Sequence, residues 1–199
     1  MLRGSTARCR LLLQLLLVGV ALVGVIVLGV QSQSPRTVAV VDYAVSGQSL
    51  ALLYPLETSV EVSTLRLAGI TAPDLDQAPW GPAARDCLNQ QVRDQTVRIE
   101  AQDPEVDSFG RLWAYVWRGE NLVNQILLAE GCAYIDETAL LHHPQSEDWI
   151  YAQERARILG LGIWDPDQPL RQSPQAFRQA QTTPSSITPS SITPSSTEP

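Results

Sequence analysis

The sequence has 199 residues, of which 14 are basic and 21 are acidic, so its formal net charge is −7. All 14 basic residues are arginine, and the segment 37–167 contains eight of them against 20 acidic residues, a net charge of −12. This balance excludes a broadly basic surface that attracts nucleic acid at long range. It is typical of a domain kept soluble by its charge after export or while tethered to a membrane.

The N-terminal region has the pattern of a membrane anchor. Three arginines in 1–10 precede Leu11–Val30, in which Gln14 is the one strongly polar residue. A helix of this length crosses a hydrocarbon core of about 30 Å, and the arginines place 1–10 in the cytoplasm. We therefore expect a linker at 31–36 and an extracytoplasmic domain. A cleaved signal peptide, which would leave a secreted protein, is the alternative, although its apolar core is usually about 7 to 15 residues long.

Periodicity and turn residues divide 37–167 into short elements. Alternating and β-rich runs predict five strands, at 37–43, 48–54, 60–67, 95–100 and 111–118. Three helices are predicted, at about 82–93, at about 121–130 and from Ser146 to Gly160. Their ends follow from a proline suited to a first turn, a serine suited to an N-cap and glycines suited to C-caps. We expect a single domain over 37–167.

The C-terminal region is rich in Gln, Ser, Thr and Pro, and Pro-Ser-Ser-Ile-Thr occurs at both 184–188 and 189–193. Such a sequence has too little apolar surface to offset chain entropy, so we expect 168–199 to be disordered.

The cysteines leave two alternatives open. Cys9 precedes the apolar segment, so Cys87 and Cys132 are the two that could pair in an oxidising compartment. Buried free thiols are the alternative. His142 and His143 have no cysteine or histidine partner at ligand spacing, so a zinc site is not expected.

Two motifs carry the most information about function. Residues 65–74 read LRLAGITAPD, and residues 107–117 read DSFGRLWAYVW. Together with the closing Gly-Leu-Gly-Ile-Trp at 160–164, they resemble the staphylococcal nuclease (thermonuclease) family. The resemblance covers essentially all of 37–167 and implies an α+β fold, a five-stranded OB-type β-barrel with three packed helices.

The resemblance also implies an activity and two phosphate-clamping residues, Arg66 and Arg111. Members of the family hydrolyse phosphodiesters of DNA or RNA with Ca²⁺. The metal and two guanidinium groups neutralise the charge that builds on the phosphate, while a carboxylate positions the attacking water. Taken alone, Arg66 would be an ordinary solvent-facing strand residue. Arg111 would be a surface partner of Asp107, an ion pair worth about 0–1 kcal/mol.

The acidic positions of the family are mostly missing. Gln48 and Thr71 stand where the resemblance places calcium-binding aspartates, so two formal charges are absent from the metal site. Asp74 stands where the catalytic glutamate belongs and is one methylene shorter, and a displacement of about 1 Å can cost on the order of 100-fold in rate. Asp42 and Asp76 are the nearby acids that could compensate.

Two functions from different classes remain. The first is a membrane-anchored, extracytoplasmic, calcium-dependent nuclease, weak or inactive because its calcium carboxylates are replaced. The second is a non-catalytic nuclease-like OB module that binds or assembles with a protein partner. The base-stacking tyrosines of the family also lack counterparts, since Glu137 and Ala139 stand near their positions, although Tyr134 could replace one. The residue chemistry and the negative charge favour an impaired site.

Overall fold

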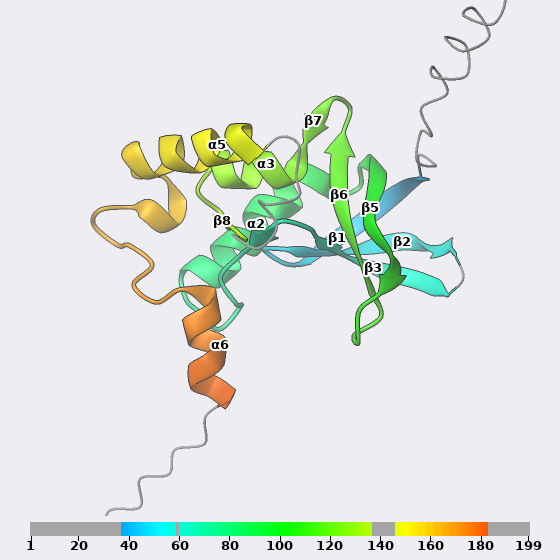
Figure 1. Ribbon diagram of the computed structural model, residues 1–199, viewed down its shortest axis with the longest axis horizontal. Coiled ribbons are helices and arrows are strands. Elements are labelled where there is room, and N and C mark those ends of the chain that lie inside the picture. Colours follow the sequence, from blue (N-terminus) through cyan, green and yellow to red (C-terminus); the bar gives the residue numbers. More distant parts are fainter. Residues whose placement is uncertain (1–36, 59, 137–145, 183–199) are drawn as a thin grey trace, which may run out of the picture. The chain divides into compact units, whose positions relative to one another are not determined.

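The core of the fold is a closed β-barrel. The computed structural model describes residues 37–58, 60–136 and 146–182. Five strands form the barrel: β1 (Thr37–Ser46), β2 (Ser49–Glu57), β3 (Glu61–Leu67), β5 (Thr96–Val106) and β6 (Arg111–Arg118). Neighbours are antiparallel in the order β3-β2-β1-β5-β6, and a parallel pairing of β6 with β3 closes the barrel (Figure 1). The predicted five-stranded barrel is confirmed.

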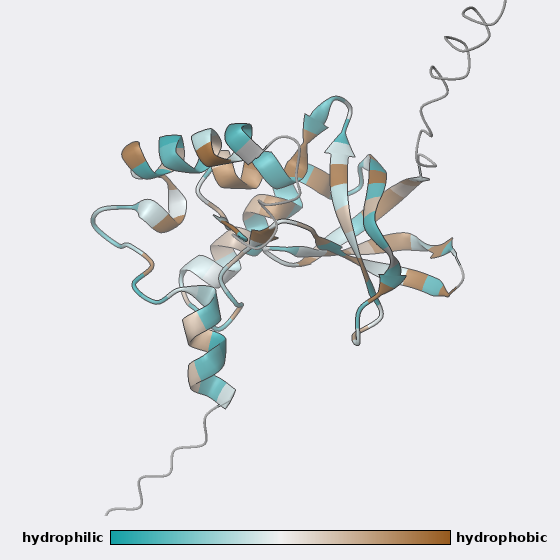
Figure 2. Ribbon diagram, viewed as in Figure 1, coloured by the Kyte–Doolittle hydropathy of each residue, from teal (hydrophilic) through white to brown (hydrophobic). Residues whose placement is uncertain are grey.

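The barrel interior follows from the two-residue period of its strands. Along β6, Leu112, Ala114 and Val116 are buried, whereas the residues between them are partly exposed. Apolar and polar residues alternate in the same way along neighbouring strands (Figure 2). The register of β1 with β2 shifts twice, which increases the local twist that a small barrel needs. Each predicted strand is present, and the strand predicted at 95–100 continues to Val106.

Three helices pack beside the barrel at the predicted places. They are α2 (Trp80–Val92), α3 (Val123–Ala129) and α5 (Ser146–Ile158), and the 3-10 turn η1 (Gly162–Trp164) follows. Just after α3, Gly131 has a φ of +68°, and a Cβ at this position would collide with the carbonyl oxygen of Leu161. Glycine at this position therefore permits the close approach of the two segments.

A disulfide joins two of these helical segments. Cys87 in α2 is bonded to Cys132, just beyond α3, with an S–S distance of 2.09 Å. Of the two alternatives for these cysteines, the structure therefore has the paired one.

A second, small sheet brings distant residues together beside the barrel. Strand β4 (Ile70–Thr71) pairs with β8 (Tyr134–Ile135), which places Thr71 opposite Tyr134. A short strand, β7 (Asn121–Leu122), extends the main sheet beyond β6. The fully buried Asn124 then fixes the end of β3, since its amide donates to the Ala68 carbonyl and accepts from the Val116 amide.

The C-terminal segment corrects the prediction of disorder over 168–199. Its described part, 168–182, contains a fourth helix, α6 (Pro174–Thr182), drawn in orange in Figure 1. The Ser173 hydroxyl caps the helix by accepting from the Ala176 amide at 3.2 Å. Side chains of the domain hold the preceding residues: Trp80 donates to the carbonyl of Gln168 at 2.9 Å and Gln77 to that of Gln172 at 3.0 Å. The amino-acid composition of this segment predicted disorder because it records only the segment's own side chains. The hydrogen bonds that hold the segment run instead from side chains of the domain to backbone carbonyls of the segment, which composition does not reveal.

Several predictions concern residues that the structure does not describe. The proposed anchor Leu11–Val30 lies outside the described residues, as do His142, His143 and the terminal repeats. Among the described helices, none is both long and apolar enough to cross a membrane.

Candidate functional site

Arg66 is a buried cation near the end of β3. Its side chain is 9% exposed, and its guanidinium carbon lies 4.8 Å from the centre of the Trp113 ring. Within the described part of the chain, its buried Nε has no hydrogen-bond acceptor. Burial, followed by the positive charges of Arg111 and Arg178, lowers the pKa of Arg66 to about 10. A buried charge is costly without an ion-pair partner, and none is present among the described residues, so this guanidinium is suited to receive an anion.

Arg111 is held by the turn that precedes it. Its Nε and a terminal nitrogen lie 2.8 and 2.7 Å from one carboxylate oxygen of Asp107. Asp107 also accepts from the backbone amides of Phe109 and Arg111 and from the Trp113 indole. Burial of the carboxyl opposes its ionisation, but these hydrogen bonds together lower the pKa of Asp107 far below its usual value. The ion pair with Asp107, which was the interpretation of Arg111 taken alone, is thus present, and five donors surround the Asp107 carboxylate.

Arg66 and Arg111 project from the same side of the barrel. The parallel pairing of β3 with β6 places Thr64 beside Arg111 and Arg66 beside Trp113. Because side chains alternate along a strand, residues two apart share a face. The positive charge of Arg111 contributes to the lowered pKa of Arg66, which agrees with this placement. The two arginines singled out by the sequence therefore lie on one face of the barrel, but Arg111 is not among the residues that line the pocket beside Arg66.

Gln48 lies in the β1–β2 turn and faces the start of the loop after β4. Its side chain is buried, and its amide oxygen accepts the backbone N–H of Ala72 at 2.7 Å. Its backbone carbonyl accepts from the Leu67 amide at 2.8 Å. Gln48 therefore fastens the turn to the segment that carries Thr71, and its side-chain oxygen is already in use.

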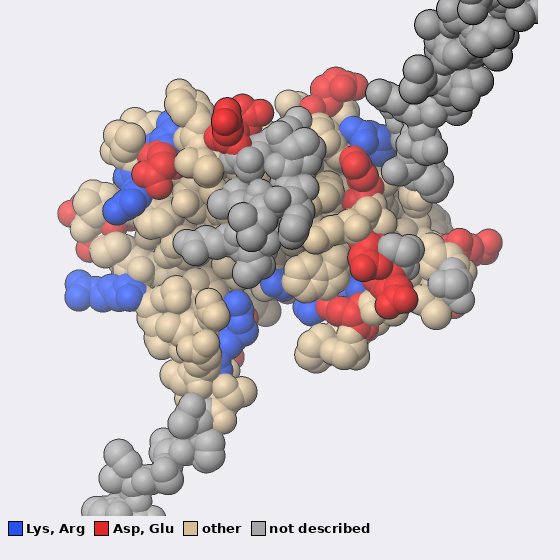
Figure 3. Space-filling view, viewed as in Figure 1, with Lys and Arg blue, Asp and Glu red and all other residues tan. Residues whose placement is uncertain are grey.

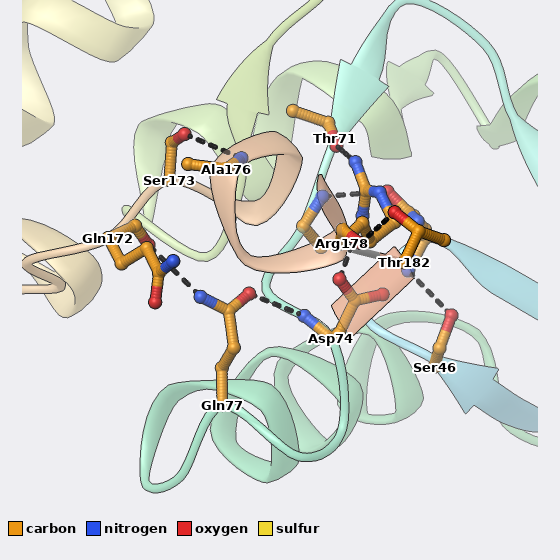
Figure 4. A network of polar contacts seen from close by, with 11 residues as sticks. Ser46, Thr71, Asp74, Gln77, Gln172, Ser173, Ala176, Arg178 and Thr182 are labelled. Carbon is orange, nitrogen blue, oxygen red and sulfur yellow. Dashed lines mark hydrogen bonds and ion pairs between the residues drawn. The ribbon is translucent and has the colours of Figure 1, made fainter. Parts of the chain in front are cut away.

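Asp74 and Thr71 meet a residue that the sequence analysis did not consider, Arg178 of α6. One guanidinium nitrogen of Arg178 lies 2.9 Å from the Asp74 carboxylate, and the other donates to the Thr71 hydroxyl at 3.3 Å. Figure 4 shows the Arg178 side chain extending from the helix to these two residues. Gln77 supports the arrangement, because its side-chain oxygen accepts the Asp74 amide at 3.0 Å. Arg178 of α6 thus contacts two of the predicted site residues, Asp74 and Thr71.

A pocket of about 550 Å³ lies at this place between the barrel and α6. Two arginines line it, Arg66 and Arg178, together with Thr71, Tyr134 and Asp136. Arginine side chains are visible in the middle of the face shown in Figure 3, near the segment that carries α6, whereas several acidic side chains lie over the strands at lower right. The charged residues of the pocket lining are thus two arginines and one aspartate.

The family is decided by comparison with known proteins. Residues 64–166, more than half of the chain, match the sequence model of the family described as staphylococcal nuclease homologue. The chain belongs to the staphylococcal nuclease family. The match includes the end of β3 and all of β6 and α5, and it contains Arg66, Thr71, Asp74 and Arg111.

Individual relatives agree with this nuclease family. The chain is 32% identical to a thermonuclease of Staphylococcus hyicus over 50% of its own length and 62% of the relative's. It is 31% identical to a thermonuclease of Staphylococcus intermedius, over 51% of the chain and 62% of the relative. An uncharacterized endonuclease of Haemophilus influenzae is 30% identical over 81% of the chain and 88% of the relative. The chain therefore spans less than two thirds of each thermonuclease and most of the Haemophilus protein.

The oxygens at the three positions that the resemblance assigns to metal binding and catalysis do not fit Ca²⁺ in this structure. Calcium takes about six to eight oxygen ligands and binds more tightly as carboxylates are added. The three positions here offer one amide, one hydroxyl and one carboxylate, from Gln48, Thr71 and Asp74. Each of these oxygens accepts from an N–H group, of Ala72 for the first and of Arg178 for the other two. Donor hydrogens thus point at the oxygens that a metal would need.

Neither of the two nearby acids belongs to a cluster of metal-ligating side chains among the described residues. In the described ranges, the one group of three metal-ligating side chains is Cys87, Glu130 and Cys132, whose two sulfurs are bonded to each other. Neither Asp42 nor Asp76 joins such a group.

Sequence reasoning missed Arg178 because it stopped the domain at residue 167. Ser173 followed by Pro174 is a helix-start signal, with a serine N-cap and a proline at the first helical position, and it could have revealed α6. Tyr134, suggested as a replacement aromatic residue, does line the pocket and packs edge-on against Trp164 with ring centres 4.9 Å apart. Glu137 and Ala139 fall in the part of the chain that is not described.

Proposed function

We propose that this domain binds the phosphate groups of nucleic acid, single-stranded or duplex, and that its calcium-dependent hydrolysis of phosphodiesters is weak or absent. The nuclease family supports the ligand class. The observation that carries the impairment is the ion pair between Asp74 and Arg178, because Asp74 is the one carboxylate among the three predicted metal and catalytic positions.

Phosphodiester hydrolysis requires cations that bind the phosphate and a carboxylate that holds the attacking water, and the residues present meet the first requirement but not the second. Arg66 offers a desolvated guanidinium without an ion-pair partner among the described residues, which suits a phosphate oxygen that gains charge in the transition state. Arg111 offers a guanidinium oriented by Asp107. Asp74 would have to hold the attacking water, but Arg178 donates to its carboxylate. We infer that binding is retained and that water activation is the step that is lost.

A cleavage assay tests this function. Purified full-length chain is incubated with a fluorescent single-stranded oligonucleotide in Ca²⁺ or in EDTA, with the thermonuclease of Staphylococcus hyicus as the active reference. We expect binding by anisotropy, with cleavage in Ca²⁺ at least about 100-fold slower than that of the reference, from the misplaced carboxylate alone. Cleavage in Ca²⁺ at a rate comparable to the reference would show that the oxygens present suffice.

The second candidate is a non-catalytic module that assembles with a protein partner. The acidity of the domain favours it, because 37–167 contains 20 acidic residues and only eight arginines. The same anisotropy measurement separates the two, because an assembly module of this kind would bind no oligonucleotide in either condition.

For location, we propose a single-pass membrane protein with its domain outside the cytoplasm. The apolar length of Leu11–Val30 supports the anchor. The Cys87–Cys132 disulfide supports an oxidising compartment, because such bonds seldom persist in a reducing cytosol. Cell fractionation tests the anchor: the full chain should be in the membrane fraction. A soluble domain whose N-terminus lies near Gln31 or Ser34 would establish the cleaved signal instead.

A further inference from the structure

We propose that Arg178 takes the place of the metal ion, so that the pocket between the barrel and α6 binds a nucleotide phosphate without any metal. This inference rests on the proposed function and identifies Arg178 as the positive charge that takes the role of the metal ion. The ligand class is a phosphate ester of the size of one nucleotide, from a strand end or a free nucleotide.

The position of Arg178 is fixed by contacts that do not involve a ligand. Ser173 caps α6, and Gln77 binds both the Asp74 amide and the carbonyl of Gln172. Trp80 holds the chain earlier, through the carbonyl of Gln168. The segment is therefore attached to the domain at several points before α6 begins. A cation held in this way pays little ordering entropy when a ligand arrives.

The contacts of the guanidinium leave donors for a ligand. Arginine carries five N–H donors, and Arg178 directs one to Asp74 and one to Thr71. Its side chain is 41% exposed and lines the pocket. Asp74 and Thr71 thus hold this cation with the same oxygens that the family resemblance assigns to metal binding and catalysis, and the remaining donors are available to phosphate oxygens.

Arg66 is the second arginine of the pocket lining. It is more than nine-tenths buried and lines the same cavity, and its Nε has no acceptor among the described residues. Arg66 and Arg178 are close enough to disfavour each other's charge, as the lowered pKa of Arg66 reflects. With Asp136, the lining has two positive charges and one negative. An anion between the two guanidinium groups would relieve their repulsion.

The size of the pocket limits the ligand. A volume of about 550 Å³ lies within the range of about 300–1,000 Å³ usual for small-molecule sites. It suits one nucleotide unit rather than a duplex. Tyr134 at the wall gives a flat apolar surface beside the two cations.

The experiment measures binding of a fluorescent ten-nucleotide adenine strand to the purified full chain, in EDTA and in Ca²⁺. Adenosine 5′-monophosphate is the competitor, and its affinity relative to the strand distinguishes a free nucleotide from a strand end. Arg178→Gln removes the cation, Arg178→Lys keeps the charge, and Arg171→Gln is the matched control, because Arg171 is an exposed arginine of the same segment.

We expect equal affinity in EDTA and in Ca²⁺. Arg178→Gln should weaken binding about tenfold, as expected for one charge-assisted contact, while Arg171→Gln changes it less than about twofold. The plot of log affinity against log salt should become shallower by about 0.7 for Arg178→Gln, the value for one lost contact to a single strand. Arg178→Lys should keep the wild-type slope, which a merely structural role would not explain.

Other results would overturn the inference. Binding that requires Ca²⁺, or an Arg178→Gln variant that binds as well as the wild type or better, would remove Arg178 as the substitute cation while leaving the proposed function intact. Arg178→Lys and Arg178→Gln variants with the same affinity and salt slope would do so too. Absence of any binding by the wild type in both conditions would remove the proposed function as well.

Discussion

Replacement of Asp107 has the effect that the structure allows us to estimate in most detail. Its carboxylate receives two bonds from the Arg111 guanidinium, two from backbone amides and one from the Trp113 indole, at 2.7–3.1 Å. Hydrogen bonds to a charged group contribute about 1.5–3 kcal/mol, against about 0.5–1.5 kcal/mol for neutral ones. Asp107→Asn keeps the shape and an acceptor but removes the charge. Since the Asp107 side chain is 18% exposed, we expect a loss of about 1–2 kcal/mol in the free energy of unfolding at pH 7.

The loss of unfolding free energy in Asp107→Asn should depend on pH in one direction. The folded-state pKa of Asp107 is lower than its unfolded value, so its contribution is fully present above about pH 4 and is lost as the pH falls further. Urea unfolding at several pH values from 7 to 2.5 measures it. Asp103→Asn is the matched control on the same hairpin, because among the described contacts Asp103 accepts from the Glu105 amide alone. An Asp107→Asn variant as stable as the control at pH 7, or one whose deficit persists unchanged at pH 2.5, would refute this reasoning.

Three further predictions concern the site. A double-mutant cycle of Asp74→Asn with Arg178→Gln should give a coupling of about 0.5 kcal/mol in urea unfolding, because both side chains are partly exposed; a coupling of zero would mean that the ion pair does not form in solution. Gln48→Asp, Thr71→Asp and Asp74→Glu together should give Ca²⁺-dependent cleavage of single-stranded DNA when Arg178→Gln is added and little without it, and equal cleavage in both backgrounds would contradict the role of Arg178. Affinity for an adenine oligonucleotide should be about tenfold lower for Arg66→Gln than for the wild type, and an unchanged affinity would exclude Arg66 as a contact.

The barrel could be predicted from the sequence because its signals are local. Strand β6 alternates buried and partly exposed residues, and α5 begins at the predicted serine. The motif around Arg66 and Arg111 indicated the family because it combines residue type, order and spacing. These features survive even where neighbouring acids are replaced.

The site as a whole could not be predicted, because its decisive contact joins residues 104 positions apart in the chain. Nothing local to Arg178 points to Asp74, and the low apolar content around it indicated disorder. The docking of α6 depends on single hydrogen bonds from Gln77 and Trp80 to backbone carbonyls, which no periodicity records. The acceptor role of Gln48 is hidden in the same way, since an amide that replaces a metal ligand and an amide that ties two loops look alike in sequence.

The most direct test of the central claim is a calorimetric titration of the full-length wild-type chain with Ca²⁺. We predict no saturable heat up to about 5 mM Ca²⁺, because the oxygens of Gln48, Thr71 and Asp74 already accept from N–H groups and supply a single formal charge. Stoichiometric binding with a Kd of about 100 µM or tighter, abolished by Asp74→Asn, would contradict it and would show that Arg178 yields its position to the metal.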